Sequence, residues 1–301
     1  MAKIGAIFKR RKAIRNIRKI TRTMELIATS RFRRALDRAV KAEAYTRKIA
    51  ELAADLSASA TDLTHPLLQK RDEIKNSILL VISSNRGLCG GYNASIIRDA
   101  HTALSRARSE NVNVRLEISG KRAIAYFRYQ GVPAAATYTQ FEDKPRFDEV
   151  EVLANQYLAA YIAGKIDRVE VAYMKFLNAA RQTPVVETLL PLSSLSVETR
   201  KPAPAGEAAA PAAQGKVAYE FLPEAGEILE ELVPTALKVR LFKMFLDAAV
   251  SEQIARRVAM KAATENAGDL IKDITRVYNR TRQANITKEI SELIAGAEAL
   301  K

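Results

Sequence analysis

The chain has 301 residues, of which 48% are hydrophobic and 27% charged, a balance typical of a globular protein with a sizeable core. Its longest aliphatic run, Ile78–Ile82, is far shorter than the roughly 20 apolar residues that cross a bilayer. The single cysteine, Cys89, excludes an intramolecular disulfide and a cysteine-rich zinc site. The net charge of +14 is concentrated in residues 1–41, where fourteen Lys and Arg accompany only two acidic residues. Such a segment favours an acidic protein surface, nucleic acid or an anionic membrane as partner.

The first element is a predicted helix from Ile4 to about Leu56. A seven-residue repeat of mostly apolar side chains predicts one column of a coiled-coil seam. That column is Ile7, Ile14, Thr21, Ala28, Ala35, Ala42, Ile49 and Leu56. We place the companion column three residues further on, at Arg10, Ile17, Met24, Arg31, Arg38, Tyr45 and Leu52. The helix is expected to end before the Ser-rich stretch that leads to Pro66.

The middle third alternates between strand and helix patterns. Strands are predicted at 77–83, 112–118, 134–138, 168–176 and 184–190, and helices at 94–109, 121–129 and 148–163. This alternation predicts a Rossmann-like α/β domain, with a mostly parallel sheet and helices on its faces.

The last third begins with a segment of low complexity. Ala, Pro and Gly occupy twelve of the fifteen positions in 201–215, which predicts a mobile surface loop. A helix is then expected from Pro223, with a break or kink at Pro234, and a long terminal helix over 236–300. Its predicted seam is Met260, Ala263, Ala267, Leu270, Ile274, Val277, Thr281 and Ala284. A second apolar set, out of phase with the first, is Ile286, Ile290, Leu293, Ala297 and Leu300.

Two long helices therefore flank the α/β domain, and each needs a partner for its apolar stripe. We predict an antiparallel two-helix coiled coil formed by the N- and C-terminal helices, with the α/β domain inserted between them. The domains are expected at 1–60 (first helix), 70–198 (α/β), 199–217 (Ala/Pro-rich loop) and 218–301 (last helix). The last helix should outrun the first by about 12 residues, or about 18 Å.

The C-terminal sequence carries a family resemblance. The run V-Y-N-R-T-R-Q-A-N-I-T followed by E-I-S-E-L-I-A-G-A resembles the signature of the gamma subunits of F-type (rotary) ATP synthases. The resemblance is strongest at 1–36, 84–93 and 219–300. It implies a central rotor shaft that couples an ion-driven membrane ring to a catalytic hexamer and has no catalytic site, metal or cofactor of its own. The implied partners are three alpha and three beta subunits, the epsilon subunit and the membrane c-ring, at the cytoplasmic face of a bacterial membrane.

The resemblance also implies contact residues. A basic patch opposite acidic beta-subunit loops would comprise Lys9, Arg10, Arg11 and Lys12. Met24 would face a bearing loop of a beta subunit, although its place in the seam predicts plain packing equally well. Arg256, Gln283 and Thr287 would contact a beta-subunit loop, and Ile290 and Leu293 belong to the terminal turns that need a socket.

The glycine-rich run S-N-R-G-L-C-G-G-Y-N, residues 84–93, lies between a predicted strand and helix, where phosphate loops occur. It lacks the G-K-[ST] ending of a P-loop and the G-x-G-x-x-G spacing of a dinucleotide site, which favours a structural turn. Asn85 stands where the gamma family usually has Asp, and Cys89 is expected to be a packed residue. No nucleotide is expected to bind directly.

Two alternatives stay open from the sequence: a basic coiled-coil protein that binds nucleic acid, and an α/β enzyme that uses the glycine-rich run. The sequence shows no catalytic constellation, so hydrolysis by this chain alone is not expected.

Overall fold

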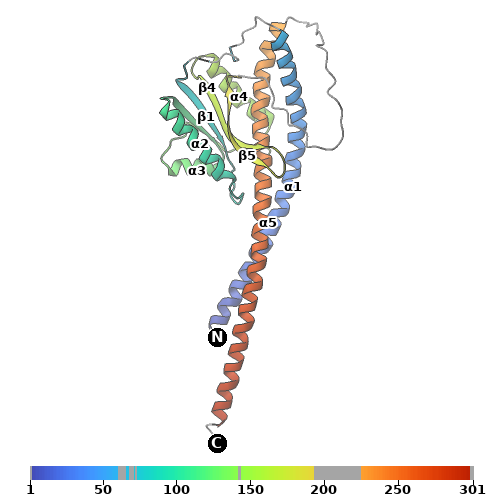
Figure 1. The fold of residues 1–301 in the computed structure, drawn as a ribbon, viewed down its shortest axis with the longest axis vertical. Coiled ribbons are helices and arrows are strands. Elements are labelled where there is room, and N and C mark those ends of the chain that lie inside the picture. Colours follow the sequence, from blue (N-terminus) through green and yellow to red (C-terminus); the bar gives the residue numbers. More distant parts are fainter. Residues whose placement is uncertain are drawn as a thin grey trace. The chain divides into compact units, whose positions relative to one another are not determined.

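The computed structural model describes residues 2–59, 66–67, 71, 73–141, 144–192 and 225–298, and the predicted Ala/Pro-rich loop at 199–217 lies outside them. Two long helices, α1 (Ala2–Ser59) and α5 (Ala225–Glu298), flank an α/β layer in the sequence (Figure 1). The chain divides into two compact units. The helical unit comprises Met1–Ser30, Leu88–Gly90 and Ala255–Lys301, and the sheet unit comprises Arg31–Gly87 and Gly91–Ile254.

The sheet has five strands in the order β3-β2-β1-β4-β5. They are β1 (Asn76–Ile82), β2 (Asn113–Ser119), β3 (Ala136–Tyr138), β4 (Arg168–Phe176) and β5 (Gln182–Leu190). All neighbouring pairs are parallel except β4 and β5, which are antiparallel. The predicted mostly parallel sheet is therefore confirmed, and each strand begins and ends within two residues of its predicted bounds.

Helices cover both faces of this sheet (Figure 1). They are α2 (Tyr92–Ser109), α3 (Lys121–Tyr129) and α4 (Phe147–Ile162), together with the first part of α5. Alternate residues of the central strand β1 point to opposite faces, and Ile78, Leu80 and Ile82 join α4 and α5 in one core. Tyr157, Tyr161, Leu237 and Phe245 belong to the same core. The continuous apolar run of β1 reflects burial on both faces, as is usual in parallel sheets.

Of the break or kink expected at Pro234, the break is wrong, because α5 is one helix from Ala225 to Glu298 with Pro234 inside it. Proline cannot donate the hydrogen bond that this turn of the helix needs. Tertiary packing holds the turn instead, since Val233 and Leu237 on either side of it are fully buried in the core. The Thr235 hydroxyl also donates to the Glu231 carbonyl at 2.9 Å. The end of α1 differs as well, because the helix continues into the Ser-rich stretch as far as Ser59.

Within each unit, α1 packs antiparallel to α5. In the helical unit the Thr264 hydroxyl donates to the Thr21 hydroxyl at 2.8 Å, and the Arg11 guanidinium stacks 4.6 Å from the Tyr278 ring centroid. In the sheet unit a small core joins α1, β4 and α5 through Phe32, Ala35, Phe176, Val250 and Ile254. Residue numbers rise along one helix as they fall along the other. The predicted antiparallel pairing is therefore confirmed in both units.

The α5 seam also consists of two columns, of which the first is Met260, Ala267, Ile274 and Thr281. The first column of each predicted seam is correct where the structure describes its side chains, but the companion columns are partly wrong. Arg10 and Ile17 on α1, and Leu270, Val277 and Ala284 on α5, are exposed. Met24, Arg31 and Arg38 on α1 and Ala263 on α5 are at least partly covered as predicted, but further covered residues lie four residues after the first column. On α1 they include Arg11, Glu25, Phe32 and Ala39; on α5 they are Thr264, Ile271, Tyr278 and Asn285. A 3-4 repeat has two possible companions, and only the position of the partner helix decides between them.

One buried carboxyl in the sheet unit predicts a pH dependence of stability. Asp247 of α5 is only 7% exposed, and its pKa is raised from 3.8 to about 7, chiefly by burial. Within this net shift, Lys243 and Lys175 act to lower the pKa, and Glu43 and Glu187 act to raise it. Because the folded pKa exceeds the unfolded value, the favourable contribution of the neutral carboxyl is complete below pH 4. It is lost as the pH rises through about 7.

We expect Asp247→Asn, which stays neutral at every pH, to stabilise the full chain at pH 8 by roughly 2 kcal/mol more than at pH 4. Urea unfolding at the two pH values measures the difference. Asp269→Asn is the control, because its side chain is 71% exposed and forms an exposed ion pair with Lys272. An equal effect of Asp247→Asn at both pH values would contradict the prediction.

Candidate interaction surfaces

The glycine-rich run forms a turn that its own side chains hold. The Ser84 backbone N–H donates to Asn93 Oδ1 at 3.0 Å, and the Ser84 hydroxyl donates to the Arg86 carbonyl at 2.7 Å. Leu88 and Gly90 adopt positive φ values of 64° and 57°, which explains the glycine at the second position. The Tyr92 hydroxyl donates to the Ala248 carbonyl at 3.1 Å and so attaches the run to α5. These bonds support the structural interpretation of the run.

Asn85 uses both ends of its amide. Its Nδ2 donates to the Thr139 carbonyl at 3.0 Å, and its Oδ1 accepts from the Lys121 backbone N–H at 3.0 Å. An aspartate could accept from Lys121 but could not donate to Thr139. Asn85 therefore joins the ends of β1 and β3 to the start of α3. Cys89 is buried, as expected of a packed residue.

The four cationic residues at 9–12 do not form one uniform patch. Lys9, Arg10 and Lys12 are exposed, whereas Arg11 turns toward α5 and stacks on Tyr278. A larger basic surface lies next to them along the helical unit, in a groove of about 1690 Å³. Its cationic lining residues are Lys12, Arg15, Arg18, Lys19, Arg22 and Lys272, and its acidic ones are Glu265 and Asp269. The groove therefore has a net positive charge.

No described residue of this chain covers the end of α5. The contacts of Thr21 with Thr264 and of Arg11 with Tyr278 place the start of α1 level with residues near Asn285. Every described residue after Asn285, from Ile286 to Glu298, is exposed. In Figure 1 the C-terminal end of α5 likewise extends past the start of α1. The apolar residues Ile286, Ile290, Leu293 and Ile294 are between 47% and 74% exposed.

The sequence-predicted contact residues fall into two groups. Thr287, Ile290 and Leu293 lie on this exposed end of α5, and Gln283 is exposed just before it. Gln283 and Thr287 are four residues apart and share one face. Met24 and Arg256 are only half-buried and lie nearer the packed part of the helices.

Exposed apolar side chains continue along both helices of the helical unit. They are Phe8, Ile17, Ile20, Leu26 and Ile27 on α1, and Val258, Leu270 and Val277 on α5. Ile17, Leu270 and Val277 were assigned to the seam from their spacing, so this surface was missed. The available signal was the excess of apolar positions over those that a two-helix seam can bury.

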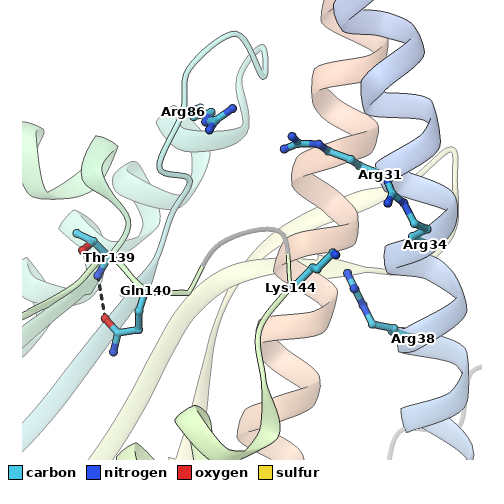
Figure 2. Close-up of a pocket in the computed structure, with 7 residues that line it drawn as sticks. All are labelled: Arg31, Arg34, Arg38, Arg86, Thr139, Gln140 and Lys144. Atoms are coloured by element: carbon cyan, nitrogen blue, oxygen red, sulfur yellow. Dashed lines mark hydrogen bonds between the residues drawn. The ribbon is translucent and has the colours of Figure 1, made fainter.

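A basic pocket of about 620 Å³ lies in the sheet unit (Figure 2). It is lined by Arg31, Arg34, Arg38, Arg86, Thr139, Gln140 and Lys144. The sequence pattern did not indicate this site, because Arg31 and Arg38 fit the predicted seam. Their spacing with Arg34 was the available signal, since it places all three on one side of α1.

No group of three or more His, Cys, Asp or Glu among the described residues is arranged to hold a metal ion. In the same part of the chain, no helix is both long and apolar enough to cross a membrane.

Comparison with known proteins decides the family. A family model described as ATP synthase matches residues 3–300. The ATP synthase gamma chain of Rhodopirellula baltica is 52% identical over 301 residues, which cover both chains completely. The gamma chain of Leptospira biflexa is 39% identical over 300 residues, again with complete coverage of both chains. This chain belongs to the ATP synthase gamma-chain family.

Solved structures agree with this gamma-chain fold. A chain in the Euglena gracilis mitochondrial ATP synthase structure of OSCP, F1 and c-ring in rotational state 3 has a TM-score of 0.65 and 18% identity. The match covers 99% of this chain and 95% of that one. A chain in the rotor structure of the same enzyme in rotational state 1 has a TM-score of 0.59, covering 95% and 99%.

The exposure of the C-terminal end of α5, residues 286–298, predicts that two substitutions on this helix differ in their effect on stability. Leu293 is 74% exposed, whereas Met260 is 4% exposed in the packed part of the same helical unit. We expect Met260→Asp to destabilise the full chain by roughly 3 kcal/mol, because it buries a carboxylate without a partner. Leu293→Asp should change the unfolding free energy by less than about 0.5 kcal/mol. Thermal unfolding of both variants measures the contrast, and equal destabilisation would show that the tip packs against its own chain.

Proposed function

We propose that this gamma chain is the central rotor shaft of an F-type ATP synthase. It transmits torque between an ion-driven ring in the membrane and a catalytic head of three alpha and three beta subunits. In this proposal the chain contacts the epsilon subunit and the c-ring as well, and it works at the cytoplasmic face of a bacterial membrane without crossing it. The gamma chains of two bacteria, at 52% and 39% identity over their full lengths, support this assignment.

The main support for the proposal is that the C-terminal end of α5 exposes apolar side chains to solvent. Ile290 and Leu293 lie where no described residue of this chain covers them, and a partner must remove them from water. A sleeve formed by the alpha and beta subunits would do so. Exposed polar residues that precede them on α5, such as Gln283 and Thr287, would form hydrogen bonds that break and re-form as the shaft turns.

The structure of the helical unit suits a part that turns. Its two helices present different side chains around their circumference, with a net-positive groove on one surface and exposed apolar residues on others. Such an asymmetric shaft presents a different surface to each of three catalytic subunits at a given angle. Those subunits can then differ in their affinity for nucleotide. Rotation of the shaft gives each subunit the different affinities one after another.

Torque transmission also requires stiffness. α5 is one helix of 74 residues, and α1 is one helix of 58 residues. The helices are packed through small side chains, with Ala28 and Ala267 buried in the helical unit. Close packing of two helices resists bending better than either helix alone. We propose that the chain has no catalytic site of its own, because its proposed role is mechanical.

We expect removal of the residues after Ala284 to weaken assembly or coupling while the sheet unit stays folded. The deleted segment lies in the helical unit, so its loss removes none of the sheet core. The truncated chain is expressed with alpha and beta subunits, and the ATPase activity and composition of the purified complex are measured. Near-UV circular dichroism of the truncated chain is the control, and loss of its tyrosine signal would contradict the expected independence.

We expect Gln283→Ala with Thr287→Ala to lower the ATPase activity of the assembled head severalfold. Because both side chains are exposed, the melting temperature of the isolated chain should not change. A variant with Arg280→Ala, which is exposed one turn away, is the matched control. Unchanged activity of the assembled double variant would show that the two polar groups are not contact residues.

A further inference from the structure

A groove between α2 and α3 in the sheet unit has a chemistry that the proposed rotor role does not use. The two helices are in contact (Figure 1), and the groove has a volume of about 660 Å³. This volume lies within the range of small-molecule sites. The described lining residues are Asn93, Ala94, Ile97, Arg98, His101 and Thr102 of α2, together with Arg122 and Tyr126 of α3.

The groove carries an excess of positive charge. Its described lining includes two arginines and no carboxylate. The residues before and after each lining residue are all described, and Asp99 is the only acidic one among them. The Asp99 carboxylate lies 3.9 Å from Arg98 Nε in an exposed ion pair, which is weak. Among the described residues, none forms an ion pair or a hydrogen bond with the side chain of Arg122 or His101.

The glycine-rich run at 84–93 makes room for one of these cations. The Arg122 guanidinium lies against Gly87, where a Cβ atom would meet Nη2 at 3.1 Å and Cζ at 3.3 Å. These contacts are tight, so any larger residue at 87 would push the guanidinium aside. The turn itself does not require this glycine, because Gly87 lacks the positive φ value of Gly90.

An anion in the groove would be held by side chains and not by the helix terminus. The backbone N–H groups of Lys121, Arg122 and Ala123, at the start of α3, already donate to residues 83–85. Arginine offers a planar fork of N–H donors that matches phosphate oxygens in pairs. His101 has an imidazole N–H donor in either tautomer.

The rest of the groove suits a flat apolar group. Ile97 is 8% exposed, and the Tyr126 ring lies at 87° to the ring of Phe127, with 5.4 Å between the centroids. Phe127 is fully buried, so it holds the Tyr126 ring in a fixed orientation. An aromatic ring of a ligand could stack on Tyr126 and cover Ile97.

We propose that the groove between α2 and α3 binds a small aromatic phosphomonoester. Arg98 and Arg122 would bind its phosphate oxygens in bidentate fashion, and His101 would donate a further hydrogen bond. A phosphomonoester carries a charge of about −1.5 to −2 at pH 7, which matches the two arginines. Its ring would stack on Tyr126. The proposal concerns the sheet unit alone and does not depend on the rotor function.

A phosphorus NMR titration of the full chain with phenyl phosphate, at constant ionic strength, tests the proposal. We expect saturable binding, and at least a tenfold weaker affinity for Arg122→Gln. Arg128→Gln is the matched control, because Arg128 is exposed on the same helix outside the lining. Its loss should change the affinity less than twofold. Both side chains are exposed, so neither variant should change the melting temperature.

Two further variants test the two ends of the ligand separately. Gly87→Ala should weaken binding severalfold by displacing Arg122. Gly91→Ala, in the same run, should not, because its Cβ would meet only Ser95 Oγ, at 3.9 Å. Tyr126→Leu should weaken the binding of phenyl phosphate severalfold but leave that of inorganic phosphate unchanged.

Several outcomes would overturn the proposal. Absence of saturable binding would do so, as would equal losses in Arg122→Gln and Arg128→Gln, which would indicate general attraction to a chain of charge +14. Inorganic phosphate that bound as tightly as phenyl phosphate would show that the ring contributes nothing. A hexaglutamate peptide that bound more tightly than phenyl phosphate would indicate a docking site for an acidic protein segment instead.

Adenosine monophosphate and flavin mononucleotide, titrated in the same way, distinguish two sources of an aromatic phosphomonoester. Tighter binding of either one than of phenyl phosphate would support the proposal and identify the source. Either result would also correct the expectation that no nucleotide binds directly.

Discussion

The packing of α1 against α5 is the constraint on which the rest of the structure depends. These helices come from opposite ends of the chain, and each carries an apolar stripe that its own turns cannot bury. In the helical unit the buried contacts include Thr21, Ala28, Met260 and Ala267, and in the sheet unit Phe32, Ala35, Val250 and Ile254. Small side chains let the two backbones approach closely. The α/β layer can be inserted between the helices because the helices pair without it in the helical unit.

The helical unit buries only part of its apolar surface. Ile17, Ile20, Leu270 and Val277 remain about half exposed, and the last turns of α5 are exposed throughout. A chain that folded for its own stability alone would gain by covering these groups or replacing them with polar ones. Their presence supports the proposal that partners cover these surfaces. The same unit carries the net-positive groove, so the partner contact that we propose here would involve both apolar burial and charge.

The sheet unit contains buried polar groups that illustrate how charge is tolerated inside it. Glu117 is almost fully buried, but it accepts hydrogen bonds from Tyr138 at 2.9 Å and Tyr157 at 2.8 Å, and Arg115 lies 3.0 Å away. Its charge is thus compensated, and its presence together with burial raises the pKa of both tyrosines. Asp247 is different, because burial is the largest cause of its shift and raises its own pKa. A carboxylate can be buried with little loss of stability where hydrogen bonds from the protein replace those from water.

The sequence by itself determined the elements and their class. Periods of two and of three to four residues located five strands, three short helices and two long ones, because side-chain direction follows backbone geometry. Local sequence patterns could not predict structural features that depend on contacts with a distant segment of the chain. Pro234 stays inside α5 because the sheet core holds its neighbours, and the seam companions were set by the position of the opposite helix. The basic pocket joins α1 to loops that lie far from it in the sequence, so only the tertiary structure could bring Arg38, Arg86 and Thr139 to one cavity.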